Sequence, residues 1–319
     1  MIPLVFTIVA LIAAGVVYER FAEHRARRTL PAPGHLVDIG GRRLHLYTLG
    51  QEFGPTVVLE QGAGSPSLLW WPLQRQIAHF ARVVSYDRAG YLWSDPPSGK
   101  QGIDDRVDDL HALLEKGCVP GPYIFVAHSY GGLLSRRFAK CYPEQTAGLV
   151  LVDAPPESVL FKASFLDYCA KGATFQRILA ATAQVGLLRL CARWMPMLLL
   201  PDEPSAKALC LSPAFMTATA QDFASLVAAP VSLRAHEQAG ELGDKPLIVL
   251  VHGIPFPGPA TALEADWATG MDRAATLSSD SRLIVAQQSN HMIHLDEPGV
   301  VIDAVRRVYA AAQSGKPIC

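Results

Sequence analysis

Short apolar runs alternate with helical patterns along most of this chain, and this alternation limits the possible folds more than any other feature. The runs at residues 56–60, 82–86, 123–127 and 148–152 have the length and composition of buried strands. Stretches with apolar side chains at helical spacing lie between them. Strands that alternate with helices form a mostly parallel, twisted sheet covered by helices on both faces. The sequence therefore predicts an α/β fold.

Three further segments complete the predicted order of elements. Residues 35–50 alternate apolar and polar side chains around a Gly-Gly pair, which is typical of a β-hairpin. Two more apolar runs, at residues 246–251 and 282–286, extend the sheet, and a final helix follows. Between residues 154 and 245 the alternation stops, and the sequence is rich in Leu, Ala and Met at helix-like spacing. This stretch indicates a helical unit inserted into the α/β core.

The N-terminus is the most apolar part of the sequence. Residues 1–18 carry no charged side chain, and residues 19–28 are strongly charged. An apolar helix of this length is at the short end of what spans a hydrocarbon core of roughly 30 Å, so we expect a single-pass membrane anchor. Arginines follow the apolar segment and none precedes it. Because positive charge favours the cytoplasmic side, the main domain is predicted to be cytoplasmic.

A cleaved signal peptide is the alternative interpretation of the same segment. The small residues Ala13, Ala14 and Gly15 could serve a signal peptidase, but the basic region that normally precedes the apolar run is missing. Cleavage would make the protein extracytoplasmic or secreted. With the anchor favoured, the predicted organisation is an anchor at 1–18, a linker at 19–34, core at 35–153, helical insertion at 154–245, core at 246–312 and a tail at 313–319.

Composition argues against several classes of function. The chain has 28 basic and 29 acidic side chains and no long basic run, so no nucleic-acid partner is expected. Its 6 cysteines lie far apart and form no Cys-x-x-Cys pair, which gives no support to a zinc or dithiol redox site.

A serine, an aspartate and a histidine lie just past the ends of three predicted strands: Ser129, Asp153 and His291. In parallel α/β sheets, ligands and catalytic groups gather at the carboxyl ends of the strands. Serine, carboxylate and histidine, in this chain order, match the nucleophile, the orienting acid and the general base of a catalytic triad. The sequence therefore predicts that these three side chains meet at one edge of the sheet.

Five motifs in the same order resemble the α/β-hydrolase superfamily, in its serine-nucleophile branch with a helical cap. They are LEQGAG, VVSYDRAGYLWSD, FVAHSYGG, LVLVDAPPE and SNHMIHLDEP. The resemblance covers residues 35–309. It implies an α/β-hydrolase fold with the cap inserted after the sixth strand, and it implies neither a metal nor an organic cofactor. In this family Asp87 and Arg88 of the second motif are mainly structural.

Ser129 is the predicted nucleophile. A serine hydroxyl attacks poorly on its own, and a tight strand-to-helix turn exposes it to both a base and a substrate. The usual form of this turn is Gly-x-Ser-x-Gly, and this chain has Ala127 and Gly131 in the glycine positions. The alternative interpretation of Ser129 is a simple helix N-cap.

His291 is the predicted general base, which takes the proton from Ser129 and returns it to the leaving group. Its rivals are His128, His252 and His294. His294 is expected to have a structural or supporting role. His128, which directly precedes the nucleophile, is expected to pack beneath the turn.

The acid is predicted at Asp153, directly after the sixth strand. Many relatives carry it after the seventh strand, but this chain has no carboxylate there before Glu264 and Asp266. Asp266 is the second candidate, since the role requires only a hydrogen bond to the histidine Nδ1. The alternative for Asp153 is an aspartate that caps the next segment.

The oxyanion hole is predicted to use the backbone N–H groups of Tyr130 and Ala63. Relatives often have His-Gly just before the second donor, whereas this chain has Gln61-Gly62. Because the donor is a backbone group, this change leaves the predicted hole intact.

These residues predict a serine hydrolase that cleaves a carboxylic ester, or less favourably an amide, of an apolar small molecule. The apolar segment at 185–201 is most simply an ordinary helix packed on the domain. A sharper hypothesis is that this segment, together with the Trp70-Trp71 pair, lines an apolar pocket, or that the segment dips into the membrane. Perhydrolysis or C–C bond hydrolysis on the same triad, and a non-catalytic binding protein of the same fold, are the alternatives. Dehalogenase and epoxide hydrolase chemistry is disfavoured, because it uses an aspartate where this chain has Ser129.

Overall fold

The computed structural model describes residues 2–50, 54–194, 204–228, 239–256 and 258–318. Within them, eight strands form one sheet in the order β1-β2-β4-β3-β5-β6-β7-β8. Strand β2 is antiparallel to both of its neighbours, β1 and β4, and strands β3 to β8 are parallel to one another. The strands are β1 (His35–Asp38), β2 (Arg43–Leu49), β3 (Thr56–Glu60), β4 (Val83–Tyr86), β5 (Tyr123–His128), β6 (Thr146–Val152), β7 (Leu247–His252) and β8 (Ser281–Ala286).

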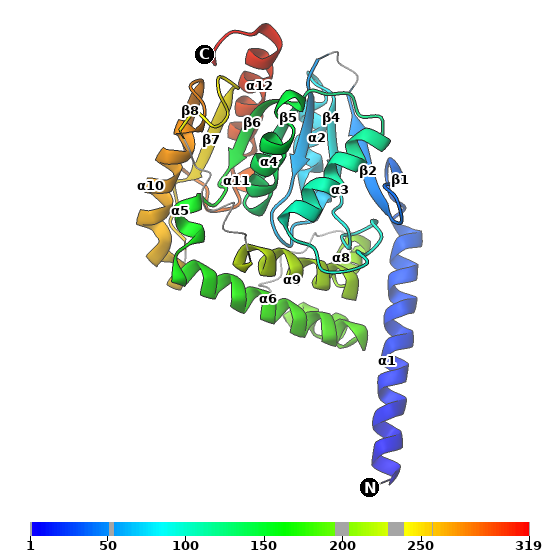
Figure 1. Cartoon of the computed structure of the whole chain (residues 1–319). Coiled ribbons are helices and arrows are strands. Elements are labelled where there is room, and N and C mark those ends of the chain that lie inside the picture. Colours follow the sequence, from blue (N-terminus) through cyan, green and yellow to red (C-terminus); the bar gives the residue numbers. More distant parts are fainter. Residues whose placement is uncertain (1, 51–53, 195–203, 229–238, 257, 319) are drawn as a thin grey trace.

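Helices cover both faces of this sheet, so the predicted α/β fold is confirmed (Figure 1). Helices α3 (Ile103–Lys116), α4 (Tyr130–Cys141) and α10 (Glu264–Ala274) share one apolar core with the sheet. Helices α2 (Trp71–Ile77) and α12 (Pro298–Ser314) share a second core on the opposite face. Strands β3, β5 and β7 are buried along their whole length, as expected for strands covered on both sides.

The inserted helical unit lies between β6 and β7, after the sixth strand as predicted. It contains α5 (Glu157–Leu160), α6 (Ala163–Gln184), α7 (Leu187–Cys191), α8 (Pro204–Cys210) and α9 (Pro213–Val227). Helices α6 and α9 pack against each other along their length and form a layer at one end of the sheet (Figure 1). This layer, called the cap below, covers the carboxyl ends of the strands. A short α11 (Ile293–Asp296) follows β8.

Helix α1 (Ile2–Thr29) is longer than the predicted anchor. It continues through residues 19–29, which were expected to belong to a linker, because Ala, Glu and Arg in this stretch favour helix. Its apolar first part is exposed and extends away from the rest of the molecule (Figure 1). Helix α1 is long and apolar enough to cross a membrane, a property that signal sequences share.

Candidate active site

Ser129 lies in the tight turn between β5 and α4. Its backbone has φ 50° and ψ −123°, a conformation that costs a non-glycine residue on the order of 1 to 3 kcal/mol. The turn brings Gly131 close to the neighbouring strand, and a Cβ on Gly131 would lie 2.6 Å from the carbonyl oxygen of Glu60. Ala127 is fully buried in β5. Its methyl group is therefore compatible with this turn.

The structure brings Ser129, His291 and Asp153 together at the carboxyl edge of the sheet. His291, in the loop between β8 and α11, has its Nε2 3.0 Å from the hydroxyl oxygen of Ser129. Its Nδ1 donates a hydrogen bond of 2.6 Å to Oδ2 of Asp153. His291 thus connects the serine to the carboxylate, which is the geometry that the sequence predicted for a triad.

Asp153 follows β6 directly and is fully buried. It receives hydrogen bonds from His291, from Nδ1 of His252 at 2.8 and 2.9 Å and from Nε1 of Trp267 at 3.1 Å. Burial by itself raises the pKa of Asp153, but the hydrogen bonds from His252 and His291 outweigh burial and lower the pKa below its ordinary value. Asp153 is therefore a buried carboxylate that stays ionised.

Asp266, the second candidate for the acid, lies elsewhere. It is in the first turn of α10, is partly exposed and forms an ion pair of 2.8 Å with Lys162. The carboxylate beside His291 is that of Asp153. At the start of α10 it is Glu264, and not Asp266, whose carboxylate contacts a residue bound to Asp153, while Asp266 pairs with Lys162 of the inserted helical unit.

The other two histidines near the turn are buried. His128 Nε2 donates to the carbonyl oxygen of His291 at 2.9 Å, and the ring of His294 stacks on Trp70 at 4.4 Å. Burial, together with the charges of neighbouring histidines, lowers the pKa of both His128 and His294, the latter to about 3. They are neutral at physiological pH and support the loop that carries His291.

The loop after β3 lies against the turn that holds Ser129. A Cβ on Gly62 would lie 2.7 Å from the His128 ring and 3.2 Å from Cβ of Ser129. Arg88 fixes this loop through hydrogen bonds of 2.7 Å to the carbonyl oxygens of Gln61 and Gly62. Ala63 and Tyr130, the predicted oxyanion donors, line the same cavity as Ser129.

A cavity of about 190 Å³ opens onto Ser129 and His291. Apolar side chains from the cap, from the segment before α10 and from α10 itself form most of its wall, among them Phe165, Tyr168, Phe223, Leu226, Leu263 and Trp267. The sequence had indicated residues 185–201 and the Trp70-Trp71 pair instead. Residues 195–201 lie outside the described part of the chain. Trp70 is buried against His294, and Trp71 stacks on Trp93.

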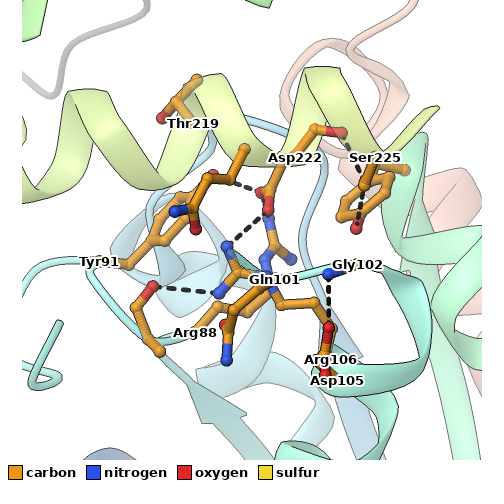
Figure 2. A network of polar contacts seen from close by, with 12 residues as sticks. Arg88, Tyr91, Gln101, Gly102, Asp105, Arg106, Thr219, Asp222 and Ser225 are labelled. Carbon is orange, nitrogen blue, oxygen red and sulfur yellow. Dashed lines mark hydrogen bonds and ion pairs between the residues drawn. The ribbon is translucent and has the colours of Figure 1, made fainter. Parts of the chain in front are cut away.

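A buried polar network joins the cap to the core (Figure 2). Asp222 of α9 accepts hydrogen bonds from Arg88 at 3.0 Å and Tyr91 at 2.6 Å, and it forms an ion pair of 2.8 Å with Arg106. The hydroxyl groups of Ser225 on α9 and Tyr130 lie 2.8 Å apart. The cap helix and the loop that Arg88 holds are thereby fixed to each other.

Sequence reasoning missed the surroundings of Asp153. His252 had been considered only as a rival base, and Trp267 had not been considered at all. His252 directly follows an apolar strand, which is the signal that identified Ser129 and Asp153. Glu264 had been set aside because it lies far along the chain from β7, but the start of α10 returns it to within 3.2 Å of His252.

Comparison with known proteins shows the family of this chain. The model of the alpha/beta hydrolase family matches residues 57–304. The chain belongs to this family. Among curated proteins it is similar to the uncharacterized protein YqjL of Bacillus subtilis (strain 168), with 28% identity over 281 residues that cover 88% of this chain and 94% of that protein.

Other proteins similar to this chain are named as enzymes. Part of the chain is similar to the pimeloyl-[acyl-carrier protein] methyl ester esterase of Shewanella woodyi, with 34% identity over 113 residues, which are 35% of this chain and 40% of that esterase. In fold it resembles a thermophilic esterase from Thermogutta terrifontis, with a TM-score of 0.64, 19% identity and coverage of 86% of this chain and 95% of that one.

Proposed function

We propose that this chain is a serine hydrolase that cleaves carboxylic esters through an acyl-enzyme on Ser129. The observation that carries the proposal is the continuous contact from the Ser129 hydroxyl through both ring nitrogens of His291 to the buried carboxylate of Asp153. The strained turn at Ser129 and the apolar cavity in front of it support the same conclusion.

Each predicted residue has a defined part in this reaction. His291 takes the Ser129 proton as the hydroxyl oxygen attacks the ester carbonyl, and Asp153 holds the ring in the required tautomer and stabilises the imidazolium. The backbone N–H groups of Tyr130 and Ala63 stabilise the oxyanion of the tetrahedral intermediate. His291 then gives the proton to the departing alcohol. Water, activated by the same histidine, releases the acid.

The cavity indicates which esters fit. Its wall is apolar and aromatic, so an uncharged acyl or alcohol group can be buried there, while a charged group would lose its hydration without gaining a partner. The butyrate and succinate monoesters of one chromogenic alcohol form a suitable pair, because their acyl groups differ by a terminal carboxylate. We expect kcat/KM to favour butyrate by at least about 10-fold. Equal rates, or a preference for succinate, would contradict the assigned pocket.

The choice of acid can be tested by amide substitution of the two aspartates. Asp153→Asn should lower kcat for ester hydrolysis by a factor on the order of 10³ to 10⁴, since the amide cannot stabilise the His291 imidazolium. Asp266→Asn, a matched control on the exposed start of α10, should leave kcat within about 3-fold of the wild-type value. The reverse pattern would show that the wrong carboxylate has been assigned.

A further inference from the structure

His252 occupies the end of β7, where many α/β hydrolases carry the acid. Its side chain is almost fully buried, with 3% exposed. Nδ1 lies 2.9 Å from Oδ1 and 2.8 Å from Oδ2 of Asp153, and Nε2 lies 3.2 Å from Oε2 of Glu264. Both ring nitrogens therefore face a carboxylate.

This arrangement determines the protonation of the ring. An ionised carboxylate only accepts hydrogen bonds, so each ring nitrogen must carry a proton to bond to its partner. A histidine with both nitrogens protonated is an imidazolium cation. Burial by itself lowers the pKa of His252, but the hydrogen bonds and charges of Asp153 and Glu264 outweigh burial and raise its pKa above the ordinary value.

Glu264 is itself held in place. Its second oxygen, Oε1, accepts a hydrogen bond from the backbone N–H of Phe256. Glu264 is the first residue of α10, where the helix dipole favours negative charge. Among the described residues, the titratable groups that face His252 are Asp153 from the end of β6, Glu264 from α10 and His291, which bonds to the same Asp153 oxygen. The remaining neighbours, Phe256 and Trp267, are aromatic.

We propose that His252 is a positioning residue, held as an imidazolium between Asp153 and Glu264, that fixes the Asp153 carboxylate toward His291 and places a positive charge on the carboxylate that His291 binds. The inference rests on the proposed function, because it assigns His252 a role in that reaction. Its first part follows from geometry, since the contacts of His252 with both oxygens of Asp153 prevent the carboxylate from rotating away from His291.

Its second part follows from charge. His252 and His291 bond to the same oxygen of Asp153, so a positive charge on His252 repels a second positive charge on the His291 ring. Loss of the His252 charge should therefore move the acidic limb of the pH–rate profile to higher pH.

The test uses His252→Asn, which retains an N–H donor near the position of Nδ1 but cannot carry a charge. The rate constant for fluorophosphonate labelling of the full chain would be measured from pH 5 to 9. We expect the acidic limb of His252→Asn to lie about 1 to 2 pH units above that of the wild type. The matched control His79→Asn, at an exposed position of the surface, should follow the wild-type profile. If His252→Asn only reduces the labelling rate constant and leaves the acidic limb at the same pH as in the wild type, the proposal is overturned.

A second measurement does not depend on catalysis. Nitrogen-15 NMR of the histidine rings distinguishes a doubly protonated ring from a neutral one, and the His252 signals can be assigned by their loss in His252→Asn or His252→Gln. We expect both ring nitrogens of His252 to be protonated at pH 8 in the wild type. In Glu264→Gln, which removes one carboxylate, the His252 ring should lose one of its two protons at a lower pH than in the wild type. A neutral His252 ring in the wild type at pH 7 would refute the inference.

The two measurements separate this inference from the function on which it rests. Folded wild-type protein that does not react with the fluorophosphonate would contradict the serine hydrolase proposal. Labelling that proceeds with an undisplaced profile in His252→Asn would leave that proposal standing and contradict only the role of His252.

Discussion

At the scale of single residues, the candidate site depends on how closely two loops approach the strand ends. Gly131 faces the backbone of Glu60 and Gly62 faces the side chains of His128 and Ser129. Neither position has room for a Cβ atom. The Ser129 hydroxyl is therefore presented by a turn that two glycines allow, and its environment is sensitive to the smallest added group.

Gly131→Ala tests this close approach. The added methyl group would lie 2.6 Å from the Glu60 carbonyl oxygen, so backbone must move. We expect a loss of about 1 to 3 kcal/mol in the free energy of unfolding and a large loss of ester hydrolysis. Gly299→Ala, in α12 where the new methyl group meets open space, is the matched control and should be neutral or slightly stabilising. Full activity in Gly131→Ala would contradict the described turn.

The buried histidines predict a dependence of stability on pH. The pKa of His294 is about 3 in the folded protein because of burial, followed by the charge of His291, whereas an unfolded chain has a histidine pKa of about 6.5. Below about pH 6.5 the unfolded state binds a proton that the folded state excludes. The free energy of unfolding therefore falls as the pH falls, by up to about 1.4 kcal/mol per pH unit. The effect is absent above pH 7.

His294→Phe retains an aromatic ring against Trp70 and removes the titratable group. When the pH falls from 7.5 to 5.5, the free energy of unfolding should decrease by about 1 kcal/mol less in the variant than in the wild type. Urea denaturation in detergent at the two pH values measures this difference. His79→Asn, at the surface, should behave as the wild type does. An identical pH dependence in His294→Phe and the wild type would show that this ring is not held neutral in the folded state.

At the scale of elements, the cap is fixed to the core by buried charge. Asp222 of α9, with Arg88 and Arg106, is almost fully excluded from solvent (Figure 2). Removal of one member of such a cluster leaves the other charges buried without compensation. The position of α9 also determines where Phe223 and Leu226 enter the cavity. Cap stability and substrate access are thus linked through one carboxylate.

Asp222→Ala should lower the free energy of unfolding by about 3 to 5 kcal/mol, because two buried guanidinium groups lose their shared partner. Asp167→Ala is the matched control on α6. Its carboxylate is 59% exposed and pairs with a Lys171 that is 76% exposed, so a change below about 1 kcal/mol is expected. Urea denaturation of both variants measures the difference. Equal effects of the two substitutions would show that the buried network does not hold the cap.

The sequence predicted elements and strand ends well because both depend on local patterns. The apolar runs alone predict that Ser129, Asp153 and His291 lie at one edge of the sheet. The pairing of Asp222 with Arg88 could not be predicted in this way, because charged residues follow no local pattern that indicates burial. The burial of such residues depends on partners that are distant in the sequence, and Arg88 and Asp222 are 134 positions apart.

At the scale of the whole molecule, α1 is attached to the cap. Arg189 of α7 donates two hydrogen bonds of 2.6 Å to the carboxylate of Glu19, and both side chains are buried. The backbone of Gly15 also lies against Val185, where a Cβ would be only 2.1 Å from the carbonyl oxygen. These contacts reach into the predicted anchor itself. They support an uncleaved helix whose C-terminal half stays with the cap.

We therefore expect the full-length chain to remain in the membrane pellet after a high-pH wash, with residues 2–14 still present by mass spectrometry. A variant that lacks residues 2–14 keeps Glu19 for Arg189 and should be found in the soluble fraction. A wild-type chain that begins after Ala13, Ala14 or Gly15 would instead establish a cleaved signal peptide. The positive charges after the apolar segment predict a cytoplasmic main domain, which protease protection of intact vesicles can test.

The central claim is that Ser129 is a nucleophile activated by His291, and covalent labelling tests it most directly. The full-length protein in detergent would be treated with a fluorophosphonate and analysed by intact mass and peptide mapping. We predict one adduct, on Ser129, that is absent in Ser129→Ala, retained in the control Ser135→Ala and formed at least about 100-fold more slowly in His291→Ala. An unlabelled but folded wild type, or an adduct that persists in Ser129→Ala, would contradict the account.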